Sequence, residues 1–143
     1  MTASPRACGG WAAVALLSLL AQSGCHRATR RPPDIPGAGV PGADLAAAVA
    51  SLCQARDQAG HETGAARDTF YVVAHQRLHL EAQALAEVDR PAAGRLLIDM
   101  QRVEADLAPQ AAAPALAADL ATLATTAAAG LTRLAVPAPR CAS

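Results

Sequence analysis

The stretch LHLEAQALAEVDRPAAGRLLIDM, residues 78–100, decides the fold of this chain. Both of its halves consist mainly of Ala, Leu and charged residues, which favour helix because they lose little side-chain freedom there. Between the halves stands DRP, residues 89–91, where Pro91 ends one helix but suits the first turn of the next. The stretch therefore predicts two helices joined by a short turn, which become neighbours in space.

The same pattern extends on both sides of this stretch. Apolar residues recur at helical spacing, and turn-forming residues divide them into four segments. The predicted segments are residues 44–59, 65–88, 91–107 and 114–134. Short connections make helices that are neighbours in sequence antiparallel, and each amphipathic helix must bury its apolar stripe against the others. We therefore expect an all-α protein that forms an antiparallel up-down-up-down four-helix bundle.

Each predicted helix carries one apolar stripe that should face the core. The stripes are Leu45, Val49, Leu52 and Cys53; Phe70, Ala74, Leu78, Leu85 and Val88; Leu96, Met100, Val103 and Leu107; and Leu116, Leu120, Leu123, Ala127, Leu131 and Leu134. The abundant Ala allows helices to approach closely but buries little apolar area per residue. Modest stability is therefore expected.

The charge and the aromatic content argue against nucleic acid as a partner. Twelve Arg and no Lys are balanced by 12 acidic residues, so the formal net charge is zero. A balanced chain has no net electrostatic attraction for phosphates. With one Trp, one Tyr and one Phe, the chain also lacks a set of aromatic platforms that stack on bases.

The N-terminal segment, from Met1 to Gly24, has the three parts of a secretory signal. A short start with one arginine precedes the apolar run WAAVALLSLLA, from Trp11 to Ala21, and the small residues Ser23 and Gly24 precede Cys25. This run is too short to span about 30 Å of hydrocarbon as a helix. We therefore expect this segment to be removed during export.

The end of the signal, AQSGC at residues 21–25, resembles the lipobox of bacterial lipoproteins. The resemblance implies that Cys25 is diacylated and becomes the first residue of a mature chain anchored on the outer side of the cytoplasmic membrane. The lipobox usually has Leu three positions before the cysteine, where this chain has Gln22. The alternative is an ordinary signal peptide, cut nearby, that leaves an exported protein without a lipid.

The signal and the helical part are joined by a segment of different composition. Residues 25–43 are rich in Pro and Gly and lack apolar periodicity, which is typical of a flexible tether. The expected organisation is thus a signal peptide at 1–24, the tether at 25–43, and a helical bundle with a C-terminal tail at 44–143.

Two cysteines remain for the mature helical part. Cys8 leaves with the signal and Cys25 takes the lipid, so Cys53 in the first helix and Cys141 in the tail are left. An exported protein meets an oxidising compartment, where such a pair usually forms a disulfide. Since the tail is long enough to turn back toward the first helix, we predict a Cys53–Cys141 disulfide. In the alternative, Cys53 is a buried apolar residue and Cys141 a free thiol.

The candidate chemistry centres on His75 and His79, which stand at the i, i+4 spacing in a predicted helix. This spacing brings two imidazoles within reach of one ion. Met100 as third ligand would favour copper, whereas a carboxylate would favour zinc. Other candidates for a third ligand are His61, Glu62 and Glu81. The zinc-protease motif needs Glu directly after its first His, and this chain has Gln76 there, so proteolysis is not expected.

The histidines also have a simpler interpretation. They flank the apolar stripe, so they would form a partly exposed polar pair that hydrogen-bonds to neighbours such as Glu81. The charged residues of the helices, Glu81 included, are expected on solvated faces, with ion pairs Arg95–Asp99 and Arg102–Asp106 at the i, i+4 spacing.

Two functions follow from these patterns. The first is a non-enzymatic, lipid-anchored binding or interaction module whose partner is an unknown protein or small ligand. The alternative is a copper- or zinc-binding lipoprotein that uses His75 and His79.

Overall fold

The structure, a computed structural model, describes residues 39–108 and 114–142. In these two ranges the chain forms helices and no β-strand, so the predicted all-α class is confirmed. The elements are α1 Gly42–Ala59, α2 Thr63–Asp68, η1 Thr69–Ala74, α3 His75–Val88, α4 Arg90–Asp106 and α5 Leu116–Arg133. The predicted signal peptide, the lipidated Cys25 and most of the tether lie outside the described residues. None of the described helices is both long enough and apolar enough to cross a membrane.

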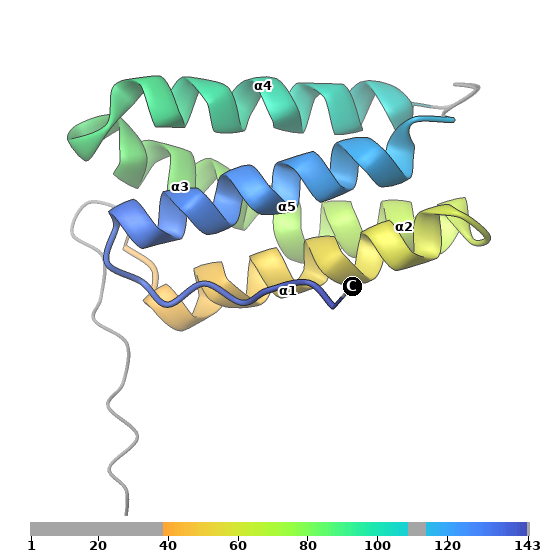
Figure 1. Ribbon diagram of the computed structural model, residues 1–143, viewed down its shortest axis with the longest axis horizontal. Helices are drawn as coiled ribbons and strands as arrows, with labels where there is room; N and C mark the ends of the chain where they lie inside the picture. Colours follow the sequence, from red (N-terminus) through yellow and green to blue (C-terminus); the bar gives the residue numbers. More distant parts are fainter. Residues whose placement is uncertain (1–38, 109–113, 143) are drawn as a thin grey trace, which may run out of the picture.

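The elements α2, η1 and α3 follow one another without a break and form one long helix. The middle part, η1, is a π-helix, in which the N–H of His75 donates to the carbonyl of Phe70, five positions earlier. With α1, α4 and α5, the long helix gives four helical rods that lie side by side (Figure 1). In this bundle α1 packs on α5 and on η1, and α4 packs on both α3 and α5.

The core contains the predicted apolar stripes apart from Cys53 and Leu134, which are half-buried, and Val88. The largest apolar side chains that are fully buried are Leu45, Leu52, Phe70, Leu78, Leu85, Leu96, Met100, Leu116, Leu120, Leu123 and Leu131. One member of the predicted stripes was wrong, because Val88 is 64% exposed. This valine is the last residue of α3, where the chain leaves the core to make the turn into α4.

The turn between α3 and α4 is fixed by Asp89. Its side chain accepts a hydrogen bond of 3.0 Å from the backbone N–H of Ala92, and Pro91 stands in the first turn of α4, as predicted. Arg133, at the end of α5, donates from Nε to Asp89 Oδ2 over 2.7 Å. The hydrogen bond from Ala92 and then that from Arg133 lower the pKa of Asp89, because both favour its charged form. The α3–α4 hairpin is therefore held to α5 at its closed end.

The predicted disulfide between Cys53 and Cys141 is confirmed. The two Cα atoms are 5.2 Å apart, within the range that a disulfide needs. The tail after α5 runs back along α1 (Figure 1), with Val136 buried against the core. Beyond the disulfide, Arg56 of α1 donates from Nη2 to the carbonyl of Ala142 over 2.9 Å. We call residues 134–142 the strap, because they bind α5 to α1.

Candidate metal centre

The two histidines lie at the start of α3, directly after the π-helical turn. The rings of His75 and His79 meet edge to face, with 4.8 Å between their centroids. His75 also contacts the fully buried ring of Phe70, whose centroid is 5.5 Å away. Both histidines are half-buried, so they flank the core as predicted. π-helical turns are rare in proteins, and those that do occur are often found at functional sites.

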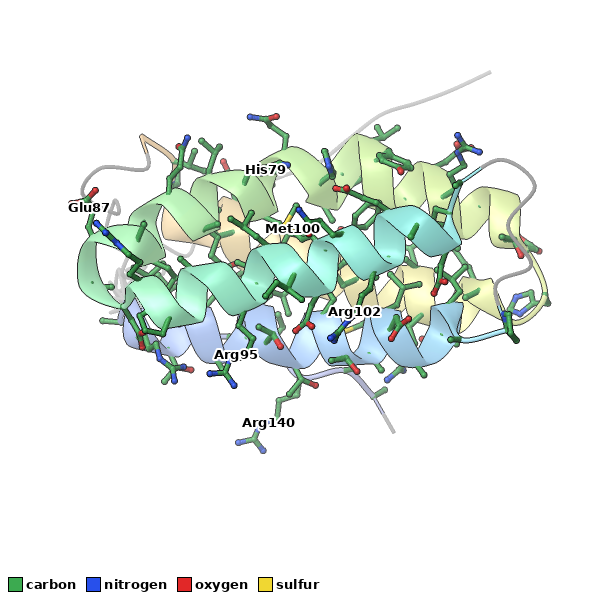
Figure 2. The ribbon with its side chains drawn as sticks, turned by 90° about the horizontal axis from the view of Figure 1, so that it is seen from above. His79, Glu87, Arg95, Met100, Arg102 and Arg140 are labelled. Carbon is green, nitrogen blue, oxygen red and sulfur yellow. A yellow bond between two sulfur atoms is a disulfide. The ribbon has the colours of Figure 1, made fainter. Side chains whose placement is uncertain are left out.

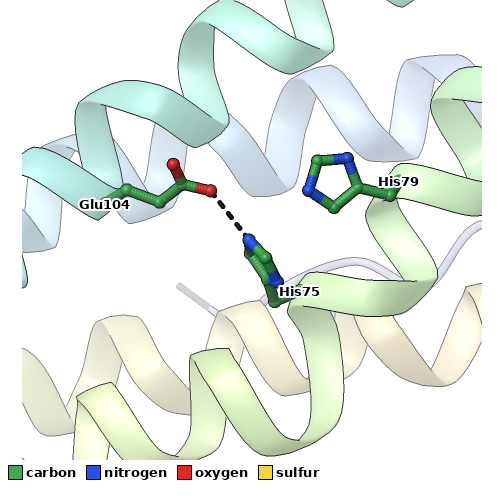
Figure 3. A group of neighbouring side chains, drawn as sticks. All are labelled: His75, His79 and Glu104. Atoms are coloured by element: carbon green, nitrogen blue, oxygen red, sulfur yellow. Dashed lines mark hydrogen bonds and ion pairs between the residues drawn. The ribbon is translucent and has the colours of Figure 1, made fainter.

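A glutamate from the neighbouring helix completes the group. Glu104 of α4 points at the histidines of α3, and His75 Nε2 lies 2.8 Å from Glu104 Oε1 (Figure 3). One ligand atom from each of His75, His79 and Glu104 lies within 4.8 Å of the others. The side chains of His75 and Glu104 are 28% and 33% exposed, so solvent ions reach them.

The group opens onto a hollow of about 590 Å³ between α3 and α4. Besides the three residues named above, the hollow is lined by Tyr71, Leu97, Met100 and Gln101. A second hollow, of about 350 Å³, adjoins the first at His79 and Leu97 and is otherwise lined mainly by Ala and Gly of the same two helices. The histidines therefore border an open seam rather than a closed core.

The residues predicted as third ligands lie at different places in the structure. Met100 is 1% exposed and lines the same hollow as the histidines. His61 lines a different hollow, beside Cys141, and Glu62 is exposed before α2. The predicted hydrogen bond from the histidine pair to Glu81 was wrong, because Glu81 lies inside the core and His75 bonds to Glu104 instead.

Glu104 was missed because single-helix reasoning does not reach across the hairpin. The turn at Asp89 offers a signal that would have found it. Residues at similar sequence distance from the turn lie opposite each other in the two helices, and His75 and Glu104 stand at nearly equal distances on either side of Asp89. The same relation places Met100 opposite His79.

The three side chains form a donor set that suits a divalent transition metal. Zinc binds imidazole nitrogen and carboxylate oxygen at about 2.0–2.2 Å, which places ligand atoms roughly 3.3–3.6 Å apart. The observed separations between the ligand atoms are up to 4.8 Å. Small rotations of the half-exposed side chains would bring these atoms into the range that zinc needs. Three protein ligands leave one position of a tetrahedral ion open. At the place where the zinc proteases have a general base, this chain has the exposed Gln76, whose amide cannot take up a proton.

A second unusual group, Glu81, lies inside the bundle. Its side chain is fully buried, and neither carboxylate oxygen has a hydrogen-bond partner. Burial raises the pKa of Glu81 to about 8, because the charged form loses its hydration. Gly130 of α5 makes room for it, since a β-carbon there would overlap Oε1. The prediction of a solvated Glu81 was therefore wrong.

The predicted ion pairs along α4 were also wrong. Arg102 donates from Nη1 to Asp99 over 2.9 Å, one turn back, instead of pairing with Asp106. Asp99 is nearly buried and accepts a second hydrogen bond of 2.8 Å from Thr126 of α5, so it faces the bundle and not Arg95. Burial, and the neighbouring carboxyl of Asp119, raise the pKa of Asp106. The acidic residues of α4 therefore contact neighbouring helices instead of lying together on one solvent-exposed face.

Fold and site together define a small disulfide-bonded helical bundle with a histidine–histidine–glutamate cluster on one seam. Comparisons with protein-family models, with curated proteins and with solved structures found no match.

Proposed function

We propose that this protein is an exported, lipid-anchored helical bundle that binds a divalent transition metal ion at His75, His79 and Glu104. The observation that carries the proposal is the convergence of these three side chains, from two helices, within 4.8 Å. This convergence supports a metal site more strongly than the i, i+4 spacing of the two histidines alone, because the third donor comes from a separate part of the chain. The metal is then the small ligand of the predicted binding module.

The donor set favours zinc or Cu²⁺. Imidazole suits both ions, and a single carboxylate completes a site that either ion accepts. Without an ion, His75 Nε2 and Glu104 Oε1 form a hydrogen bond of 2.8 Å. A metal ion would replace this hydrogen bond, and its binding weakens in acid because the ligand atoms must be free of protons. We propose binding and not catalysis, since the site has no general base at Gln76.

The position outside the cytoplasmic membrane is part of the same proposal. The resemblance of residues 21–25 to the lipobox supports an anchor at Cys25, and the Cys53–Cys141 disulfide is consistent with an oxidising compartment. We also propose the up-down-up-down order of the four rods. It is supported by the short connections and by the packing of α1 on α5 and of α3 on α4.

A zinc titration tests the metal site. At a free Zn²⁺ concentration about 100 times Kd, binding should raise the free energy of unfolding by roughly 2.7 kcal/mol. The variant His75→Ala, His79→Ala should lose this gain, because it removes both imidazoles. Thermal melting with and without Zn²⁺ or Cu²⁺ measures it.

The matched control for this titration is His61→Ala. His61 is an exposed histidine between α1 and α2, away from the cluster, and its removal should leave the metal-dependent gain unchanged. A wild-type protein that gains nothing with either ion would refute the metal site. So would an equal gain in the double variant.

Replacement of Cys25 tests the anchor. Cys25→Ala should move the exported protein from the membrane fraction to the soluble fraction, because the thiol that carries the lipid is gone. Cys8→Ala is the control, since Cys8 lies within the segment expected to be removed. Fractionation of cells and labelling with a radioactive fatty acid measure the result. Membrane association that persists in Cys25→Ala would exclude this cysteine as the anchor.

A further inference from the structure

Two possible third ligands of opposite chemical character face the same histidine pair. Met100 and Glu104 stand at the i, i+4 spacing on α4, which places them one turn apart on one face of the helix. Both line the hollow of about 590 Å³ that contains His75 and His79. Figure 2 shows Met100 and His79 on the same seam between α3 and α4. The seam thus offers a thioether sulfur and a carboxylate to an ion held by the two imidazoles.

These two donors select different ions. Thioether sulfur is a soft ligand that binds Cu⁺, whereas a carboxylate is a hard ligand that suits Zn²⁺ and Cu²⁺. Imidazole serves all three ions. Zinc therefore gains little from Met100, and Cu⁺ gains little from Glu104.

The environment of Met100 permits it to act as a ligand. Its side chain is 1% exposed and belongs to the core, so the sulfur is shielded from bulk water, but the same side chain also lines the hollow. Methionine is unbranched and has three rotatable bonds, and it changes rotamer at low cost. Rotation about these bonds can turn the thioether sulfur toward the hollow that the side chain lines.

We propose that the His75–His79 pair binds copper in both oxidation states with alternate third ligands, Glu104 for Cu²⁺ and Met100 for Cu⁺. The inference rests on the proposed metal site and names its metal. The same imidazoles and carboxylate bind Cu²⁺ more tightly than Zn²⁺ by the general order of divalent affinities. Met100 adds affinity for Cu⁺ that a zinc-binding protein would not need.

Two single variants separate the two ligand sets. Met100→Leu replaces the thioether by an apolar side chain of similar volume, a change that cores tolerate well. Glu104→Gln keeps the shape of the side chain and removes its charge. Both are made in the full chain with Cys8→Ser and Cys25→Ser, so that no thiol competes for copper while Cys53 and Cys141 stay bonded.

Affinities for Cu⁺ and Zn²⁺ are measured by competition with chromogenic chelators, without oxygen for Cu⁺ and without a thiol reductant. We expect Met100→Leu to weaken Cu⁺ binding about tenfold or more and to change the Kd for Zn²⁺ less than about twofold. We expect Glu104→Gln to show the reverse. X-ray absorption of the Cu⁺ form should show a sulfur neighbour in the parent protein and none in Met100→Leu.

The proposal is overturned if the parent protein binds Zn²⁺ but not Cu⁺, or if Met100→Leu leaves the Cu⁺ affinity unchanged. It is also overturned if each variant weakens both ions equally, because Met100 would then act only through packing. In these cases the zinc site of His75, His79 and Glu104 still stands. Failure of the site itself is recognised separately, by metal binding that persists unchanged in the His75→Ala, His79→Ala variant.

Discussion

The variant Cys53→Ser, Cys141→Ser should lose roughly 4 to 5 kcal/mol of its free energy of unfolding. The disulfide joins residues 88 positions apart, and a cross-link over such a loop removes much of the entropy of the unfolded chain. The bundle depends on this constraint because its core is rich in alanine, and alanine buries little apolar area. Urea unfolding followed by circular dichroism measures the loss.

The control for this prediction is wild type unfolded in the presence of a reductant. It should match the double variant, because both leave the strap attached to α1 only through packing and the Arg56–Ala142 hydrogen bond. A loss below about 1 kcal/mol would contradict the chain-entropy explanation. It would mean that the unfolded chain is already compact enough for the cross-link to matter little.

The second large effect concerns Glu81 and the pH. Burial raises the pKa of Glu81 from its ordinary value of 4.5 to about 8, so between these values the folded state keeps a proton that the unfolded state has lost. The contribution of Glu81 to stability is therefore complete below about pH 4.5 and falls as the pH rises toward 8. The slope is about 1.4 kcal/mol per pH unit, which gives roughly 3 kcal/mol between pH 5 and pH 7.5.

Glu81→Gln should remove this pH dependence, because the amide does not titrate. Glu81→Met, which also removes the unpartnered polar atoms, should be more stable than wild type at pH 7.5 by about 3 kcal/mol. Glu87→Gln is the matched control, since Glu87 is a glutamate nearer the surface of the same helix. Urea unfolding from pH 5 to 8.5 measures the profiles. Parallel profiles for wild type and Glu81→Gln would show that the carboxyl is hydrated in the folded protein.

The fold was predictable because local signals agree with one another. Helix-forming composition, the apolar stripes and the Asp89–Pro91 turn all indicate the same helices. The structure has them with small differences at their ends and with one π-helical part, Thr69–Ala74, inside the second. The disulfide was predicted by counting the cysteines of a chain that we expected to be exported. Val88 was misplaced because helical phase alone does not show where a helix leaves the core.

The site was only partly predictable because it depends on which helix faces α3. The i, i+4 spacing identified His75 and His79, but Glu104 belongs to the site only through the pairing of α3 with α4. Glu81 and Asp99 were assigned to solvent because charged residues are rarely buried. Their burial depends on α5, where Gly130 leaves room for Glu81 and the hydroxyl of Thr126 donates to Asp99. The pattern within one helix does not reveal either feature.

The π-helical turn at Thr69–Ala74 has a consequence for how this chain should be aligned with others. Such a turn is an α-helix that has gained one residue, so the helical phase on its two sides differs by about 100° from an uninterrupted count. An alignment with a helix of uniform pitch needs a one-residue gap between positions 69 and 74. Without that gap, either the residues before the turn or the histidines after it are compared with residues on a different face of the helix.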